Sequence, residues 1–264
     1  MSETKEHLNN KTAVVTGAGA GIGLAVSRAL AKAGATVFMT DLNEDVLSKE
    51  VQLLEDENLL VKGVVVDVTS EDSINSLSEQ VLSESGGADI LVNNAGLQIM
   101  SPIADFPVEK WDLLNSVMLR GAFLCMRQFV PQMVEGRWGR VINIASIHSI
   151  VGSPFKSAYV SAKHGLIGLT KTVALETAAK GVTVNAISPA YVRTKLVEKQ
   201  IEAQAKLHSM NKEEVIANIM LAPMPQKELI EAEEIGDVVV FLCSLSARHI
   251  NGHNLVMDGG WTAA

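Results

Sequence analysis

The chain alternates short apolar runs, rich in β-branched residues, with longer amphipathic stretches. The apolar runs predict seven strands, at Thr12–Thr16, Thr36–Thr40, Val61–Val66, Asp89–Asn93, Arg140–Ala145, Val182–Ser188 and Asn254–Met257. The amphipathic stretches predict helices, at Gly23–Ala33, Asn43–Glu57, Ser70–Ser85, Ser157–Ala179 and Glu231–Ser244. Most strands are almost wholly apolar, which is typical of a parallel sheet that helices cover on both faces. The alternation therefore predicts an α/β fold with a doubly wound sheet of about seven parallel strands.

No Pro/Gly/Ser-rich linker or internal repeat divides the 264 residues, and only seven of them are proline. We therefore expect a single domain that spans residues 1–264. Residues 194–228 depart from the alternation, since they are polar, contain methionines and end in Ala222-Pro-Met-Pro-Gln226. A compact α/β domain rarely carries so long a detour without a use. We predict a helical substrate lid there; a solvated helical excursion is the alternative.

Charge and composition narrow the class of partner. The chain has 22 Lys+Arg against 30 Asp+Glu, a net charge of −8, and no basic run. This argues against binding to nucleic acid or an anionic membrane, because both rely on clustered Lys and Arg. Cys125 and Cys243 lie in apolar helical patterns and are expected to be buried free thiols. The first ten residues are polar, and no apolar run reaches the roughly 18 residues of a membrane span. We expect a reduced, cytoplasmic protein without a metal site.

A glycine-rich turn directly follows the first predicted strand, in Thr16-Gly-Ala-Gly-Ala-Gly-Ile-Gly23. Glycines let the backbone turn sharply and approach a pyrophosphate, and the next helix offers its N-terminal N–H groups. The spacing here is Gly17-x3-Gly21-x-Gly23 rather than the common Gly-x-Gly-x-x-Gly. The turn predicts a dinucleotide site, with a tight packing turn as the alternative.

Residues at the ends of the next strands refine this prediction. Asp41 ends the second strand, 20 residues beyond Gly21, where an acid accepts hydrogen bonds from an adenosine ribose. A 2′-phosphate there meets a like charge, so NAD is favoured over NADP. Asp67-Val68 closes the third strand, in reach of the adenine, and Asn93-Asn-Ala-Gly96 ends the fourth at the edge where such sheets bind ligands. An acidic strand end, a loop aspartate and a capping turn are the respective alternatives.

A second group of residues is suited to proton transfer. Ser146 follows an apolar strand, and Tyr159 and Lys163 lie at i and i+4 on one face of the next helix. An ammonium beside a phenol favours the phenolate, so we expect a Tyr159 pKa below its ordinary value of about 10. Such a tyrosine removes an alcohol proton while hydride leaves the carbon, and Ser146 holds the oxygen. Tyr-x-x-x-Lys alone is common on helices, and a purely structural role is the alternative.

These motifs, with Asn185 and Pro189, stand in the order typical of short-chain dehydrogenases/reductases, and the resemblance runs from Lys11 to Trp261. It implies a Rossmann-type domain, usually tetrameric, that binds a nicotinamide dinucleotide. Tyr159 is then the general acid/base, Ser146 polarises the substrate oxygen, and Lys163 holds the nicotinamide ribose and tunes the tyrosine. The implied cofactor contacts are Gly17, Gly21, Ile22, Gly23, Asp41, Asp67, Val68, Asn94, Gly96, Tyr159, Lys163, Pro189, Val192 and Thr194.

Within that family the chain resembles the bacterial 3-hydroxybutyrate dehydrogenases. The resemblance rests on Asn93-Asn-Ala-Gly-Leu-Gln98, Asn143-Ile-Ala-Ser-Ile-His148, Ser157-Ala-Tyr-Val-Ser-Ala-Lys-His-Gly165, Leu196-Val-Glu-Lys-Gln200 and Asp258-Gly-Gly-Trp261. It implies that Gln98, His148, Lys156 and Gln200 hold a substrate carboxylate, while Trp261 shapes a methyl pocket. A cation with amide and imidazole donors suits a small carboxylate, because hydrogen bonds to ionised groups are the strong ones. Taken singly, each of these residues also has an ordinary surface or structural interpretation.

Two positions depart from the family pattern. Met118 stands where the family has an asparagine that kinks its helix through the main chain and holds water in a proton relay to the lysine. A thioether is only a weak acceptor and cannot donate. Asn115, one turn earlier, is a candidate substitute. Ala190 follows Pro189 where the family usually has glycine, which predicts crowding beside the nicotinamide.

The leading hypothesis is reversible NAD-dependent oxidation of (R)-3-hydroxybutyrate to acetoacetate, with the R preference carried by the resemblance alone. One rival is the same chemistry on another small hydroxy acid, a polyol or an acyl thioester. A second rival, motivated by Met118, is a non-catalytic dinucleotide-binding sensor or assembly subunit. The helices around 111–134 and 157–179 suit a subunit contact, but their pattern fits core packing equally, so a homotetramer is implied by the family only.

Overall fold

The computed structural model describes residues 8–194, 197–198, 201–202, 205 and 210–263. Its strands are β1 (Thr12–Thr16), β2 (Thr36–Asp41), β3 (Val61–Val65), β4 (Ile90–Asn93), β5 (Gly139–Ile144), β6 (Val182–Pro189) and β7 (Asn254–Met257). They form one parallel sheet in the order β3-β2-β1-β4-β5-β6-β7. The order reverses between β1 and β4, so the loops that leave these strands diverge and open a crevice at the carboxyl edge.

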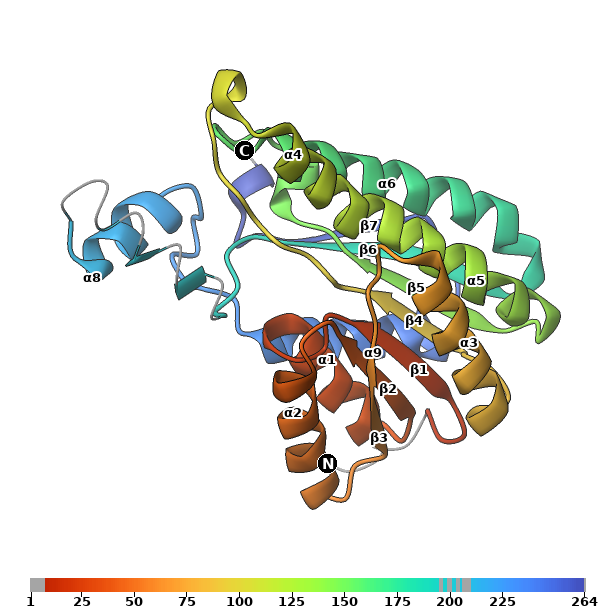
Figure 1. Ribbon diagram of the computed structural model, residues 1–264. Coiled ribbons are helices and arrows are strands. Elements are labelled where there is room, and N and C mark those ends of the chain that lie inside the picture. Colours follow the sequence, from red (N-terminus) through yellow and green to blue (C-terminus); the bar gives the residue numbers. More distant parts are fainter. Residues whose placement is uncertain (1–7, 195–196, 199–200, 203–204, 206–209, 264) are drawn as a thin grey trace.

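Helices cover both faces of the sheet (Figure 1). The α-helices of the described residues are α1 (Gly21–Lys32), α2 (Glu44–Asp56), α3 (Glu71–Ser85), α4 (Val108–Asn115), α5 (Gly121–Glu135), α6 (Ser157–Thr177), α8 (Lys212–Val215) and α9 (Ala232–Cys243), of which α8 lies away from the sheet. One hydrophobic core contains buried side chains of α1, α2 and α9, and a second core contains those of α3, α5 and α6. Neighbouring residues of one strand enter opposite cores, as Val14 and Val15 do, which explains why the strands are apolar throughout.

The predicted elements are confirmed, with ends that differ by at most two residues. Part of the difference comes from capping residues that the predicted ranges included. Asn43 accepts a hydrogen bond from the N–H of Val46, and Ser70 accepts one from the N–H of Ser73, so these two residues precede α2 and α3 rather than open them. Both cysteines are buried free thiols, and burial raises the pKa of each to about 12.

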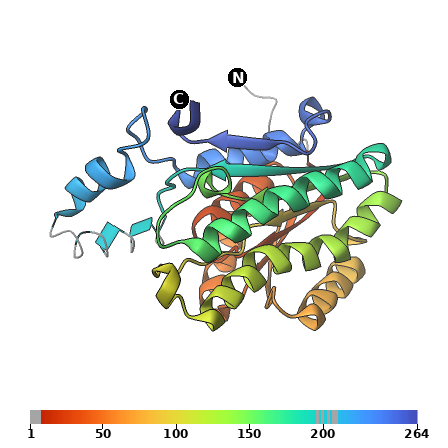
Figure 2. The same cartoon turned by 90° about the horizontal axis from the view of Figure 1, so that it is seen from above.

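The segment predicted as a lid contains α8 and a π-helical turn at Ile216–Met220, and it projects from the body of the molecule (Figures 1 and 2). It has a small apolar cluster of its own, formed by Val197, Ile201, Val215 and Met220. Its far end is fixed to the C-terminal turn, since Gln226 donates its N–H to the carbonyl of Gly259 at 3.1 Å. In the described part of the chain, no helix is both long and apolar enough to cross a bilayer.

Candidate active site

A cavity of about 350 Å³ opens at the carboxyl edge of the sheet. It lies beside the crevice between β1 and β4 and extends toward β5, β6 and α6. Most of the predicted site residues line it: Gly17, Gly21, Ile22, Asp41, Asn94, Gly96, Gln98, Ser146, His148, Lys156, Tyr159, Lys163, Pro189, Val192 and Thr194. The dinucleotide motif and the Ser-Tyr-Lys group therefore share one cavity, as a hydride-transfer site requires.

The glycine turn forms the floor of the cavity near α1. Gly17 and Gly21 have positive φ angles of 64° and 55°, which residues that carry a side chain rarely adopt. A Cβ atom at Gly17 would lie 2.9 Å from the Cα of Ala95, so glycine is required there for space as well. Gly23 does not line the cavity. A Cβ atom there would lie 2.2 Å from the carbonyl oxygen of Gly17, so Gly23 lets α1 pack against the turn.

Asn94 and Asp41 hold this turn in place from the ends of β4 and β2, the strands on either side of β1. The side-chain amide of Asn94 donates to the carbonyls of Thr16 and Gly17, both at 2.9 Å. The Asp41 carboxylate accepts the N–H groups of Gly19 and Asn43, both at 3.0 Å, and still lines the cavity. The turn thus presents backbone N–H groups and one carboxylate to the same space.

Asp67 and Val68, predicted as adenine contacts, do not line this cavity. The carboxylate of Asp67 accepts hydrogen bonds from the backbone and side chain of Thr69, at 2.8 and 2.7 Å. Val68 is buried and lies against Gly121 of α5. Both residues thus have local structural partners that the sequence pattern does not reveal.

Ser146 and Tyr159, predicted as the proton-transfer pair, both line the cavity. Ser146 lies two residues beyond the end of β5, and its hydroxyl accepts the N–H of His148 at 3.2 Å. Its side chain also bonds to Tyr159, which favours the phenolate. Burial is the larger effect, however, and Tyr191 adds to it, so the pKa of Tyr159 is raised. The expected lowering of this pKa is therefore wrong for this structure.

Lys163 explains why the tyrosine is not tuned as expected. Its Nζ donates to the carbonyl oxygen of Ile144 at 2.7 Å and lies 5.7 Å from the centroid of the Tyr159 ring. The side chain is buried, and burial lowers its own pKa to about 8. At neutral pH the ammonium is still charged, but it is directed to a main-chain carbonyl.

Lys156 and His148 form a second pair on the substrate side of the cavity. Both are buried, and Lys156 Nζ lies 3.4 Å from His148 Nε2. Burial and the nearby Lys156 ammonium lower the pKa of His148 to about 4, so its imidazole is neutral at pH 7. Burial also lowers the pKa of Lys156. The pair presents one cation and one neutral imidazole, and an anion that binds between them recovers part of the lost hydration.

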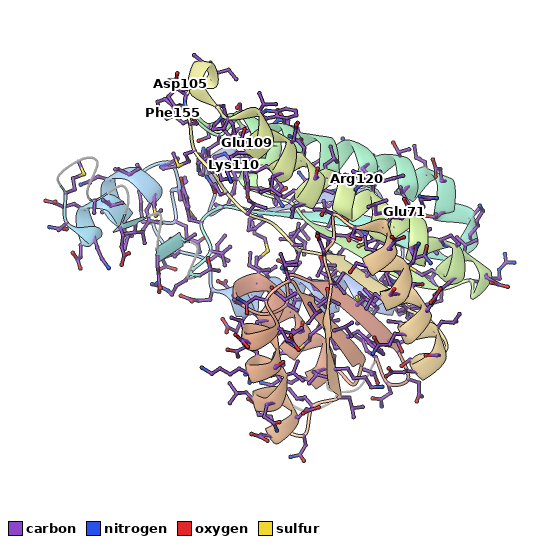
Figure 3. The ribbon with its side chains drawn as sticks, in the orientation of Figure 1. Glu71, Asp105, Glu109, Lys110, Arg120 and Phe155 are labelled. Atoms are coloured by element: carbon purple, nitrogen blue, oxygen red, sulfur yellow. The ribbon has the colours of Figure 1, made fainter. Side chains whose placement is uncertain are left out.

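A strained turn delivers Lys156 to the cavity. The N–H of Lys156 bonds to the carbonyl of Ser153 at 3.4 Å, with Pro154 second in the turn and Phe155 third. Phe155 has a φ of 66°, where glycine or asparagine is usual. Its carbonyl accepts the N–H of Ser101 at 2.9 Å, and its ring projects at the outer end of the molecule (Figure 3). Phe155 is thus outside the cavity yet sets the direction of Lys156.

Trp261 lies behind the cavity rather than in its lining. Its ring meets that of His148 edge-on, with centroids 6.1 Å apart, and stacks on Tyr191 at 6.2 Å. Asp258 fixes this turn by accepting the N–H groups of Gly260 and Thr262, at 2.9 and 2.7 Å. Trp261 therefore orients two residues that do line the cavity.

Tyr191 is the most notable lining residue that the motifs did not identify. It lies between Pro189 and Val192, which were both predicted to contact the cofactor, and this position in the sequence is the one signal that could have identified it. Ala20, Leu97, Ile144, Ala145, Ile147 and Val197 also line the cavity, although they were not named as site residues, and so does Ala190, which was expected to crowd the nicotinamide. Gln98 lines the cavity as predicted, whereas Gln200 lies outside the described residues.

Met118 lies in a π-helical turn, Ser116–Arg120, between α4 and α5. The helix therefore departs from α geometry at this position without the family asparagine. Arg120, labelled in Figure 3, ties the turn to the loop before α3 by donating to the carbonyl of Thr69 at 2.7 Å. Asn115 does not replace the asparagine, because its side chain donates back to the carbonyl of Trp111 on the outer surface.

Comparisons with known proteins agree with this geometry. A family model described as enoyl-(acyl carrier protein) reductase matches residues 17–262. A protein of Rhizobium meliloti named D-beta-hydroxybutyrate dehydrogenase is 49% identical over 258 residues, which cover 96% of this chain and 99% of the relative. A protein of Cupriavidus necator with the same name is 42% identical over 256 residues, 97% of this chain and 99% of the relative.

Solved structures show the same fold. The crystal structure of a putative gluconate dehydrogenase from Agrobacterium tumefaciens superposes with a TM-score of 0.89 at 29% identity, over 97% of this chain and 98% of that one. The region that the family model matches, residues 17–262, includes Gly17, Gly21 and Gly23 of the glycine turn and the Ser-Tyr-Lys group. The chain is an oxidoreductase that belongs to the short-chain dehydrogenase/reductase family.

Proposed function

We propose that this enzyme catalyses the reversible NAD-dependent oxidation of (R)-3-hydroxybutyrate to acetoacetate. The observation that carries the proposal is the buried pair of Lys156 and His148, 3.4 Å apart in the same cavity as Ser146 and Tyr159. A short hydroxy acid matches this arrangement, since its carboxylate meets the pair while its hydroxyl meets the tyrosine. The names of the two relatives support the same substrate and the same hand.

In this proposal one group of residues binds the carboxylate end of the substrate, and a second group acts at the C3 hydroxyl. Lys156 and His148, together with Gln98 and Gln200, hold the carboxylate, and Trp261 shapes the methyl pocket through its contact with Tyr191. At the other end, Ser146 Oγ holds the C3 oxygen, and Tyr159 takes the hydroxyl proton during oxidation or returns it during reduction. In this proposal the Lys163 ammonium favours the phenolate once substrate and NAD occupy the cavity, although in this structure it donates to the carbonyl of Ile144 and the pKa of Tyr159 is raised.

The cavity fits a nicotinamide dinucleotide with an unsubstituted ribose. The glycine turn leaves room for a pyrophosphate where side chains would fill it, and the first turn of α1 offers free N–H groups. The Asp41 carboxylate favours ribose hydroxyls and repels a 2′-phosphate, which supports NAD over NADP. Bound NAD supplies the hydride acceptor. Its proposed contacts in the cavity lining are Gly17, Gly21, Ile22, Asp41, Asn94, Gly96, Tyr159, Lys163, Pro189, Val192 and Thr194. Contacts at Gly23, Asp67 and Val68, which lie outside this lining, rest on the family resemblance alone.

Steady-state assays with both enantiomers and both cofactors test the proposal. We expect NAD reduction with the R form, little with the S form, and a strong preference for NAD. Failure to reduce NAD with (R)-3-hydroxybutyrate overturns the substrate assignment. A panel of other hydroxy acids, polyols and acyl thioesters then tests the first rival. Tight NADH binding without turnover on any of them supports a non-catalytic role.

Assembly and motion complete the proposal. We propose a homotetramer from the family resemblance; an open surface groove between α4, α5 and α6 is a candidate contact, lined by apolar Leu119, Phe123 and Leu169 and by polar Asp112, Asn115, Ser116 and Arg120. Size-exclusion chromatography with light scattering measures the assembly, and a monomer would contradict the tetramer.

We further propose that residues 194–228 close over the substrate. We also propose that the enzyme serves ketone-body metabolism in the cytoplasm.

A further inference from the structure

A second, much smaller cavity lies between the sheet and α5, next to the active site. Its volume is about 10 Å³, close to the space that one water molecule requires. Asn93 at the end of β4 and Lys163 of α6 line it, and Met118 and Cys125 contribute sulfur atoms to its walls. Lys163 also lines the large cavity, so its side chain separates the two spaces.

A chain of buried hydrogen bonds determines which atom Asn93 turns toward this cavity. The carbonyl of Leu166 can only accept, so Thr170 Oγ1 donates to it at 2.7 Å. Thr170 must therefore accept from Asn143 Nδ2, at 2.9 Å. Asn143 Oδ1 in turn accepts from Asn93 Nδ2, at 2.8 Å. The direction of the whole chain thus leaves Asn93 with a free end that is an acceptor, Oδ1.

That acceptor has no hydrogen-bond partner among the described residues, although Asn93 is buried, with only 5% of its surface exposed. A buried carbonyl oxygen without a partner destabilises the folded state, because it has given up its hydrogen bonds to water and gained none in the protein. On the same cavity lies an ammonium with three N–H donors, and within the described chain the hydrogen bond from Lys163 Nζ goes to Ile144. An unused acceptor and unused donors therefore line one space of suitable size.

We propose that a single water molecule occupies this cavity and bridges Asn93 Oδ1 to Lys163 Nζ, which makes Asn93 a positioning residue for Lys163. The thioether of Met118 and the thiol of Cys125 are weak partners, so these two groups supply the strong hydrogen bonds. The water restores part of the hydration that the ammonium loses on burial. The bridge thereby helps keep Lys163 charged beside Tyr159.

The kinetic meaning of this bridge rests on the proposed function, in which the charge of Lys163 assists Tyr159. The other titratable side chains on the two cavities that touch Lys163 are Asp41, Cys125, His148, Lys156, Tyr159 and Tyr191. Burial holds Cys125 as a neutral thiol, with a pKa raised to about 12, so it does not compete for the ammonium.

A crystal structure that resolves ordered water tests the site directly. We expect one water within about 2.7–3.2 Å of both Asn93 Oδ1 and Lys163 Nζ. A dry cavity, or an Nζ that bonds directly to Oδ1, overturns the proposal.

Variants test whether the bridge acts on Lys163. Asn93→Ala removes the acceptor, and Ala122→Val fills the cavity while both polar groups remain. Each is expected to lower the pKa of Lys163 by about one unit, measured by NMR with lysine labelled at Cε, because one hydrogen bond to a charged group is lost. Thr177→Val is the matched control, since Thr177 is also a buried threonine of α6 but bonds to the carbonyls of Val173 and Val182 and does not line the small cavity.

An equal shift in Thr177→Val shows that loss of any buried threonine hydroxyl on this helix is responsible, and it overturns the proposal. So does an unchanged pKa in Ala122→Val, which guards against an Asn93→Ala protein that does not fold. Absence of turnover on 3-hydroxybutyrate refutes the proposed function instead, and it leaves the crystallographic and NMR tests of the water unaffected.

Discussion

The buried charge of Lys163 should make the enzyme less stable than a variant that lacks it. The side chain is 4% exposed, and burial lowers its pKa from an ordinary value of 10.5 to about 8. Each pKa unit corresponds to about 1.4 kcal/mol, so the charged form costs the folded state about 3 kcal/mol at pH 7. Lys163→Met removes this cost and loses the hydrogen bond to Ile144, worth about 1–2 kcal/mol. We therefore expect a net gain of about 1–2 kcal/mol in the free energy of unfolding, with loss of catalysis.

The dependence on pH is the sharper test. Between pH 8 and 10.5 the unfolded chain keeps the Lys163 proton that the folded chain releases, so wild-type stability rises with pH in that window. From pH 7 to pH 9 the expected gain from this residue is about 1.3 kcal/mol. Lys163→Met lacks the gain, so the stability difference between the two proteins shrinks by that amount. Ionisation of the buried thiols affects both proteins equally and cancels.

Urea denaturation at pH 7, 8 and 9 measures these differences. Lys171→Met is the matched control, because Lys171 lies on the same helix and is exposed. It should follow wild type at every pH. A Lys163→Met protein that is no more stable than wild type at pH 7, with the same slope on pH, would refute the reasoning.

Three further predictions concern the substrate side, the strained turn and the cofactor. Lys156→Met should raise KM for 3-hydroxybutyrate roughly 10- to 100-fold, since a charged hydrogen bond is lost, while Lys171→Met leaves KM unchanged; equal KM values contradict the carboxylate role. Phe155→Asn should raise the free energy of unfolding by about 1 kcal/mol in urea, because asparagine tolerates the positive φ; no gain argues against strain there. Asp41→Asn should improve kcat/KM with NADP relative to NAD at least about tenfold, by removing a like charge; an unchanged ratio shows that Asp41 does not discriminate.

The sheet and the three catalytic candidates could be predicted because their signals are local. Strands such as β1 are apolar throughout, and the i, i+4 spacing of Tyr159 and Lys163 places both on one helix face. Ser146 follows from the end of its strand. Parallel strands then bring these residues to one edge whatever the details of packing.

The remaining features depend on burial and on contacts between distant segments. Tyr191 enters the site because it stacks on Trp261, which lies 70 residues away in the chain. The raised pKa of Tyr159 could not be foreseen from its spacing to Lys163, because the carbonyl of Ile144 holds the ammonium. Gly23 belongs to the glycine motif, but it lets α1 pack against the turn instead of lining the cavity. Its spacing in the sequence does not distinguish these two roles.

The stack of Trp261 on Tyr191 also gives the molecule an optical reporter. The chain has three tryptophans, Trp111, Trp138 and Trp261. None of the three lines the cavity, but Trp261 contacts two residues that do, His148 and Tyr191. Trp138 sits between the cations of Lys11 and Arg140, near the opposite edge of the sheet. Replacing Trp111 and Trp138 with phenylalanine leaves one indole whose emission reports on the substrate side alone. A stopped-flow trace of this emission then tests the proposed closure of residues 194–228 without any attached dye: a change on substrate binding is the expected result, and a flat trace contradicts it.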